Sequence, residues 1–222
     1  MPPAKSLSAT IRVVTGTIIV LLAFLLLAGG VSIPFQYESF SILYKFGIEK
    51  TFLRTGKMVG ISLALLLFFQ ILLASRFTLF ERIFSVKATL QLHRINGTVI
   101  TCLAILHPLL IKASENFTPY TFDKKYYPEF LGIGLFFGIL FLTTTAIFRS
   151  SLKISYPWWI SLHRLNATLV CIILPTHFFW VSETFKSGPP RTAAVTIFSL
   201  ILLLIARIWL RRLQSNKTIG SG

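Results

Sequence analysis

The sequence predicts an all-α integral membrane protein in which six transmembrane helices form a bundle. Hydrophobic residues make up 54% of the 222-residue chain and charged residues only 13%, against roughly 25% charged residues in an ordinary soluble domain. The net charge is nevertheless +15, and Phe occurs 21 times. An apolar chain with excess positive charge disfavours a disordered protein, a disulfide scaffold and a nucleic-acid-binding module, and favours a membrane protein with basic loops.

Six apolar stretches approach the length of about 20 residues that a helix needs to cross a bilayer. Backbone polar groups cannot be left unbonded in lipid, and the period-2 alternation of a membrane barrel is absent, so helices are expected. We expect residues 13–210 to form one transmembrane domain, between a cytoplasmic N-terminus at 1–12 and a cytoplasmic tail at 211–222. The six stretches are 13–31, 58–75, 90–111, 130–148, 158–181 and 193–210.

The first stretch also has features of a signal peptide, because Lys5 and Arg12 precede an apolar run that ends in Ala-Gly-Gly. The run is long enough to span a bilayer and further apolar stretches follow it. We therefore favour a first transmembrane helix, with a cleaved signal peptide as the alternative.

The distribution of basic residues predicts the orientation. The N-terminus, the connections after the second and fourth spans and the C-terminus share one side, with 13 of the 22 Lys and Arg residues and one of the 7 acids. By the positive-inside rule this side is cytoplasmic, in what we expect to be a bacterial cell membrane. The longer connections at 32–57 and 112–129 lie outside, where they would form surface helices or a lid.

The chain has only four histidines, and their spacing is its most specific feature. His93 and His107 are 14 residues apart in the third span, and His163 and His177 are 14 apart in the fifth. Fourteen residues at about 100° each come close to four full turns, so both members of a pair share a helix face, about 21 Å apart along the axis. One histidine of each pair therefore lies near the inner surface and the other near the outer surface.

The two histidine segments are also an internal repeat. The five residues Leu-His-Arg-Ile-Asn at 92–96 match Leu-His-Arg-Leu-Asn at 162–166, an offset of 70 residues. The third and fifth spans run in the same direction, so the histidines of the two spans lie at matching depths. If the spans face each other, His93 pairs with His163 and His107 pairs with His177.

Paired imidazoles at one depth in a membrane suggest haem ligation. An ionisable residue inside a bilayer is a functional hypothesis by default, and haem iron takes axial ligands on both faces, for which neutral imidazole is well suited. Gly97 and Ala167, four residues beyond the inner histidines, would leave clearance for a porphyrin ring. They would equally allow close helix packing, and four unrelated polar residues are the alternative to the haem interpretation.

Basic residues flank the predicted ligands. Arg94 and Arg164 directly follow the inner histidines, where their guanidinium groups would bind haem propionates or simply mark the cytoplasmic helix ends. Lys112 and Lys186 would serve the outer haem in the same way.

A proline stands beside each outer histidine. Pro108 and Pro175 would free the backbone carbonyls of Ala104 and Cys171. These carbonyls would then orient the outer imidazoles, or the prolines would only kink the helices.

The repeated His-Arg motif resembles the ferric reductase-like transmembrane domain, which ferric reductases, NADPH oxidases and bacterial relatives share. The resemblance rests on Leu-His-Arg-Ile-Asn-Gly at 92–97, on the second histidine of the same span at position 107, and on the repetition of this pattern two spans on. It covers residues 13–210. It implies two haem b groups stacked between the third and fifth helices, with His93 and His163 as ligands of the inner haem and His107 and His177 as ligands of the outer haem.

The resemblance implies a b-type cytochrome, the membrane electron-transfer component of an oxidoreductase. It would pass single electrons from a cytoplasmic flavin- and NAD(P)H-dependent donor to an acceptor outside. Many family members carry their own FAD- and NAD(P)H-binding domain, but no nucleotide-binding fingerprint follows the last span here. We therefore expect these cofactors on a separate soluble reductase, a flavoprotein or a ferredoxin-like protein.

Three alternatives stay open. One is a haem-binding membrane subunit that supplies electrons to a periplasmic methionine sulfoxide reductase, since such subunits also lack the flavin domain. The second is a metal or proton transporter that uses the histidines, although transporters usually add intramembrane acids and every acid here lies in a predicted loop or at a helix end. The third is a haem-free structural subunit. The acceptor itself, whether ferric chelate, quinone, oxygen or protein, also stays open.

Overall fold

The computed structural model describes residues 8–38, 46–75 and 77–220. In this part of the chain it contains six helices that are long and apolar enough to cross a membrane, which confirms the predicted all-helical membrane bundle. The protein is therefore an integral membrane protein. The helices are α1 (Ala9–Gln36), α2 (Gly47–Ala74), α4 (Val86–Ser114), α5 (Tyr127–Phe148), α6 (Tyr156–Val181) and α7 (Gly188–Gly220), with a short α3 (Thr78–Ile83) and 3-10 turns η2 (Lys124–Tyr126) and η3 (Glu183–Phe185).

The helices begin and end further out than the apolar stretches alone predict. Ser85 caps α4 by accepting a hydrogen bond from the Ala88 amide at 3.2 Å, and Ser155 stands at the same place before α6. His93 and His163 are thus each the eighth residue of their helix, rather than lying at its start.

The expected flanking segments and outer connections are partly helical. The tail expected at 211–222 continues α7 to Gly220, and much of the connection expected at 32–57 belongs to α1 and α2. The remaining parts of these expectations, at 1–7, 39–45 and 221–222, lie outside the described residues.

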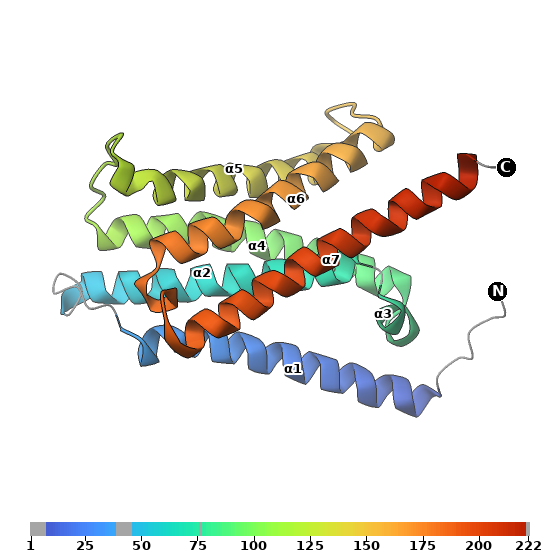
Figure 1. Cartoon of the computed structure of the whole chain (residues 1–222), viewed down its shortest axis with the longest axis horizontal. Coiled ribbons are helices and arrows are strands. Elements are labelled where there is room, and N and C mark those ends of the chain that lie inside the picture. The colour runs from blue at the N-terminus through green and yellow to red at the C-terminus, as the bar shows by residue number, and fades with distance from the viewer. Residues whose placement is uncertain (1–7, 39–45, 76, 221–222) are drawn as a thin grey trace.

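The helix directions match the alternating topology expected from the sequence. Figure 1 shows the start of α1 and the end of α7 at the same end of the bundle, together with α3 and the connection between α5 and α6. The connections between α4 and α5 and between α6 and α7 lie at the opposite end. The first residues of α1 and the last residues of α7 therefore lie on the same side of the bundle.

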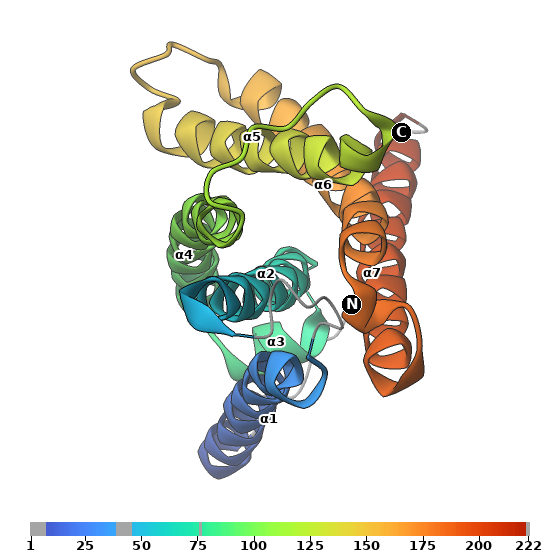
Figure 2. The same cartoon turned by 90° about the vertical axis from the view of Figure 1, so that its left-hand side faces the viewer.

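Two helix pairs make up the body of the bundle. The end-on view in Figure 2 shows α4 beside α2 and α6 beside α5, and these two pairs have the most extensive contacts in the fold. Helix α7 contacts both α2 and α6, while α1 packs on the outside against α2 and α3. One apolar core joins α2, α6 and α7, and a second joins α2, α4, α5 and α6.

The second core reveals that the internal repeat is larger than the histidine segments. When α6 is aligned with α4 so that His163 matches His93, and α5 is aligned with α2 so that Gly132 matches Gly60, the buried residues of this core occur at equivalent positions. The pair α2–α4 and the pair α5–α6 are thus two copies of one helix hairpin. The equivalent buried residues are Leu63 and Leu135, Leu67 and Ile139, and Ile100 and Val170.

Helix α1 approaches α2 closely at Gly30. A Cβ atom at this buried position would lie 2.6 Å from Cδ1 of Leu65 and 3.0 Å from Cγ2 of Ile61, and both of these side chains are buried. At the neighbouring Gly29 an added Cβ would meet nothing within 4 Å. The absence of a side chain at Gly30 therefore sets the distance between the two helices.

We predict that Gly30→Val lowers the free energy of unfolding by about 1–3 kcal/mol, because the added methyl groups overpack the contact between α1 and α2. Gly29→Val is the matched control, since it has the same intrinsic effect on the helix but faces open space. Thermal unfolding in detergent measures both. Equal losses of stability in the two variants would contradict this packing.

Candidate functional site

The four histidines lie on α4 and α6 and form two pairs. His93 and His163 are close enough for their charges to interact, and so are His107 and His177. Each pair joins one histidine of α4 to the histidine at the equivalent position of α6. The structure thus places the four histidines at two depths, with one member of each pair on α4 and the other on α6.

The outer histidine of α4 is held by the neighbouring helix α2. The Nδ1–H group of His107 donates a hydrogen bond to the Gly56 carbonyl oxygen at 2.9 Å. One turn further along α2, the imidazole lies over Gly60, where a Cβ atom would come within 2.8 Å of the ring carbon Cε1. Because Nδ1 carries the proton, Nε2 is the nitrogen that can bind a metal.

The outer histidine of α6 is held by α5 in the same way. The Nδ1–H group of His177 donates to the Pro128 carbonyl oxygen at 2.7 Å, and the ring lies over Gly132, where an added Cβ would be 2.6 Å from Cε1. Pro128 and Gly132 occupy the positions of α5 that match Gly56 and Gly60 in α2. The two outer imidazoles therefore have equivalent anchors in the two hairpins.

The inner histidine of α4 belongs to an amide network. The side-chain nitrogen of Gln70 lies 3.2 Å from Nε2 of His93 and donates to the His93 carbonyl at 3.0 Å. The Asn96 side chain donates to the side-chain oxygen of Gln70 at 2.7 Å and to the Leu66 carbonyl at 3.0 Å. These bonds fix the inner half of α4 against α2.

The inner histidine of α6 has different surroundings. The ring of Trp159 lies next to that of His163, with 5.3 Å between the ring centroids and 41° between the planes. The position equivalent to Gln70 in α5 is Leu142, which offers no amide. The two hairpins therefore differ most at the inner pair.

Three buried polar atoms at the inner site have no hydrogen-bond partner: Nδ1 of His93, Nδ1 of His163 and Nε1 of Trp159. Buried polar groups in folded proteins almost always have a partner, so each exception needs an explanation. A bound group that comes between α4 and α6 would supply one. The residues present therefore fit a ligand at this depth.

An apolar layer separates the inner pair from the outer pair. Ile100 and Ala104 of α4 and Val170 of α6 lie between the two histidine depths, and Ile100 and Val170 are each only 3% exposed. Leucines from α2 and α5 complete the layer. The two histidine pairs are thus distinct sites with packed side chains between them.

The predicted arginines lie beside the inner pair. Arg94 is exposed and Arg164 is half-buried, and their charges act on His93 and His163 respectively. The charge of Arg164 also acts on Arg212 of α7. No sequence pattern pointed to Arg212, because it lies on the last helix, far from the repeated motif.

Gly97 and Ala167, the small residues near the inner pair, differ in their surroundings. A Cβ atom at Gly97 would lie 3.3 Å from the side-chain nitrogen of Gln70, so the space beside this glycine holds an amide. Ala167 is half-buried on α6. Clearance for a porphyrin at these two positions stays a prediction.

Of the two roles expected for Pro108 and Pro175, the one in which their freed carbonyls orient the outer imidazoles is wrong. The carbonyls freed by Pro108 and Pro175 are not the ones that the outer imidazoles use, because these bond to Gly56 and Pro128 in neighbouring helices. In the sequence, the recurrence of a glycine at matching positions of the second and fourth spans was the available signal for these partners. It is weak, since glycine is common in membrane helices for packing alone.

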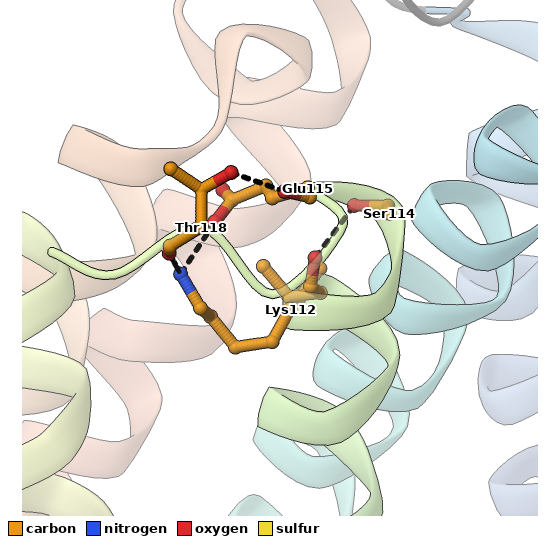
Figure 3. Close-up of polar contacts among 5 residues, drawn as sticks. Lys112, Ser114, Glu115 and Thr118 are labelled. Carbon is orange, nitrogen blue, oxygen red and sulfur yellow. Dashed lines mark hydrogen bonds and ion pairs between the residues drawn. The ribbon is translucent and has the colours of Figure 1, made fainter.

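Lys112 makes its contacts with the connection that follows α4. Figure 3 shows its side chain directed at Glu115 and Thr118 in the connection that follows α4. Its ammonium group forms an ion pair with Glu115 at 3.0 Å, donates to the Thr118 carbonyl and lies 3.6 Å from the ring centroid of Tyr120. Burial, together with the charges of Glu115 and Glu129, raises the pKa of the Tyr120 hydroxyl. Lys112 thus stabilises its own loop.

Two imidazoles at each depth equal the number of axial positions on haem iron. Within the residues that the structure describes, no three His, Cys, Asp or Glu side chains gather into a group that would hold a metal ion. His93 with His163, and His107 with His177, are the residues that would hold haem.

The comparison with protein families gives one match. The family described as "Ferric reductase like transmembrane component" matches residues 59–174, slightly more than half of the chain. The matched segment contains three of the four histidines and both glycines that lie under the outer imidazoles, and His177 follows shortly after its end. No curated protein and no solved structure matches the chain.

We predict that Gly132→Ala lowers the free energy of unfolding by about 1–3 kcal/mol, because the new methyl group overpacks the His177 ring and weakens its bond to Pro128. Gly134→Ala is the control, because a Cβ there meets nothing within 4 Å and alanine favours the helix by up to about 1 kcal/mol.

Thermal unfolding of the two variants, repeated in a His177→Ala background, measures this contact. The cost of Gly132→Ala should largely disappear once the imidazole is gone. A cost that persists unchanged in that background would show that the glycine does not serve the histidine.

Proposed function

Because the chain belongs to the family of ferric reductase like transmembrane components, we propose that it is a transmembrane b-type cytochrome that carries electrons across the membrane. In this proposal the protein takes single electrons from a cytoplasmic flavin- and NAD(P)H-dependent donor and delivers them to an acceptor on the outer side. His93 and His163 hold an inner haem, and His107 and His177 hold an outer haem.

The observation that carries the proposal is the pairing of histidines at two depths. The two Nδ1–H groups of the outer pair are already bonded to backbone carbonyls, which leaves Nε2 of each ring for iron. At the inner pair, buried ring nitrogens without partners mark a site that the chain alone does not complete. The family supports a transmembrane electron-transfer role for this arrangement.

The protein residues would tune and confine the reaction. When bound, haem supplies the one-electron redox chemistry. With two histidines as the protein ligands of each haem, the acceptor would receive electrons without binding to the iron. The carbonyls of Gly56 and Pro128 accept the imidazole protons, which fixes the tautomer and strengthens each ring as a ligand.

The apolar layer between the two sites favours electrons over ions as the transported species. Ile100, Ala104 and Val170 offer no polar groups that would replace the hydration of a metal ion or relay a proton. All seven acidic residues lie at helix ends, in the short helices or in connections. Transfer of one electron across the whole membrane still costs or releases about 2.3 kcal/mol per 100 mV of membrane potential.

A donor would dock at the end of the bundle that carries the termini. Exposed basic residues at this end, Arg82, Lys87, Lys153 and Arg211, complement an acidic flavoprotein or ferredoxin-like protein. FAD and NAD(P)H belong to this partner in the proposal. The orientation with both termini in the cytoplasm follows from the positive-inside rule.

We predict that the purified protein binds two haems per chain and that His107→Ala keeps only one, since the outer iron loses a ligand while the inner ligands are untouched. Absorbance spectra of the oxidised and dithionite-reduced protein, with a haem assay, measure the ratio. His177→Ala should give the same loss. Absence of a Soret band in the unmodified protein, or full haem content in His107→Ala, would refute the assignment.

A further inference from the structure

Two adjacent tryptophans at the start of α6 face different surroundings. The Trp158 side chain is 69% exposed, as expected for a tryptophan at the membrane–water interface. Trp159 instead turns inward, one helical turn before His163, and its ring lies against that imidazole. The interfacial role therefore belongs to Trp158 and does not account for Trp159.

The indole nitrogen of Trp159 is buried and has no hydrogen-bond partner. Nε1–H can only donate, and buried tryptophan N–H groups usually find an acceptor. Nδ1 of the adjacent His163 is also buried without a partner. The missing acceptor for Trp159 is therefore best supplied by a molecule that binds at this site.

The charges around the site indicate that this acceptor is an anion. Arg164 follows His163 directly, and its charge acts both on that histidine and on Arg212 from α7. Like charges placed close together are stabilised by an anion between or beside them, and a guanidinium group binds carboxylates particularly well. A carboxylate matches both the arginines and the indole donor.

We propose that Trp159 is a binding residue for the inner haem, with its Nε1–H group donating a hydrogen bond to a propionate carboxylate while its ring packs against the ligand His163. This inference rests on the proposed function, because it assumes a haem at the inner pair. In this proposal the Trp159 indole is a neutral hydrogen-bond donor beside the arginines. The other hairpin has no equivalent indole, because the matching position in α4 is Thr89.

The first test compares Trp159→Phe with Trp158→Phe. Phenylalanine keeps an aromatic ring against His163 and removes only the donor, and Trp158 provides a control of the same type at the adjacent position. Haem release is followed by transfer to excess apomyoglobin, in the intact chain and in a His107→Ala background that retains the inner haem alone.

We expect Trp159→Phe to release the inner haem about tenfold faster. A tenfold change corresponds to about 1.4 kcal/mol, which is close to the lower end of the range for a hydrogen bond to a charged group. The midpoint potential of the inner haem should also fall, because the propionate keeps more of its negative charge. Trp158→Phe should release haem at the unmodified rate. Equal rates and potentials in Trp159→Phe and the unmodified protein would overturn the proposal.

A second test asks whether the effect passes through the carboxylate. The haem-free chain is reconstituted with haem b or with haem dimethyl ester, in which both propionates are esterified. Trp159→Phe should release haem b about tenfold faster than the unmodified protein does. With the dimethyl ester the difference in release rate should be less than about threefold. An equal difference with both would show that Trp159 acts through packing alone and would overturn the proposal.

These experiments separate the inference from the function on which it rests. If the unmodified protein binds no haem, the proposed function fails. If it binds two haems and Trp159→Phe changes neither release nor potential, only the role of Trp159 fails.

Discussion

An imidazole inside a bilayer needs a bonding partner for each of its two nitrogens, and this requirement shapes the bundle. One nitrogen can bind a metal, but the proton on the other needs an acceptor, because an unbonded polar group in hydrocarbon costs several kcal/mol. At the outer pair the acceptors are backbone carbonyls of the adjacent helices, at Gly56 and Pro128. These carbonyls are within reach only because Gly60 and Gly132 have no side chains to hold the rings away. The pairing of α2 with α4 and of α5 with α6 is therefore tied to the orientation of the histidines.

The protein does not meet this requirement at the inner pair, where Nδ1 of His93 and Nδ1 of His163 are buried without a partner. The hairpin α2–α4 provides an amide network through Gln70, while the hairpin α5–α6 provides the ring of Trp159 and leaves its nitrogen without a partner. A repeat that is regular at the outer site thus differs at the end where the basic residues gather. In the proposed cytochrome this difference would give the two haems different potentials, since a haem potential depends on nearby dipoles and charges.

Much of this arrangement follows from the sequence, and the rest depends on contacts that leave little trace in it. Apolar length predicts the six spans, and a spacing close to a whole number of helical turns places His93 with His107, and His163 with His177, on one face of each helix. The anchors of the outer rings were not predictable, because glycine and proline in an apolar run are as readily explained by packing. The proline carbonyls were the wrong choice for a physical reason: a carbonyl on the neighbouring helix lies beside the imidazole. Trp159 stands one turn from His163 in the sequence, but which of two adjacent tryptophans turns inward depends on the packing of α6.

Electron transfer by the protein across a sealed membrane can be measured in vesicles. Purified protein is reconstituted into vesicles that enclose ferricyanide, dithionite is added outside, and the loss of ferricyanide absorbance is followed in vesicles with the unmodified chain, with the His107→Ala variant and without protein. We expect rapid reduction with the unmodified chain and reduction near the protein-free rate with the variant. Reduction by the unmodified chain no faster than in protein-free vesicles, with two haems bound, would show that the protein does not carry electrons across the membrane.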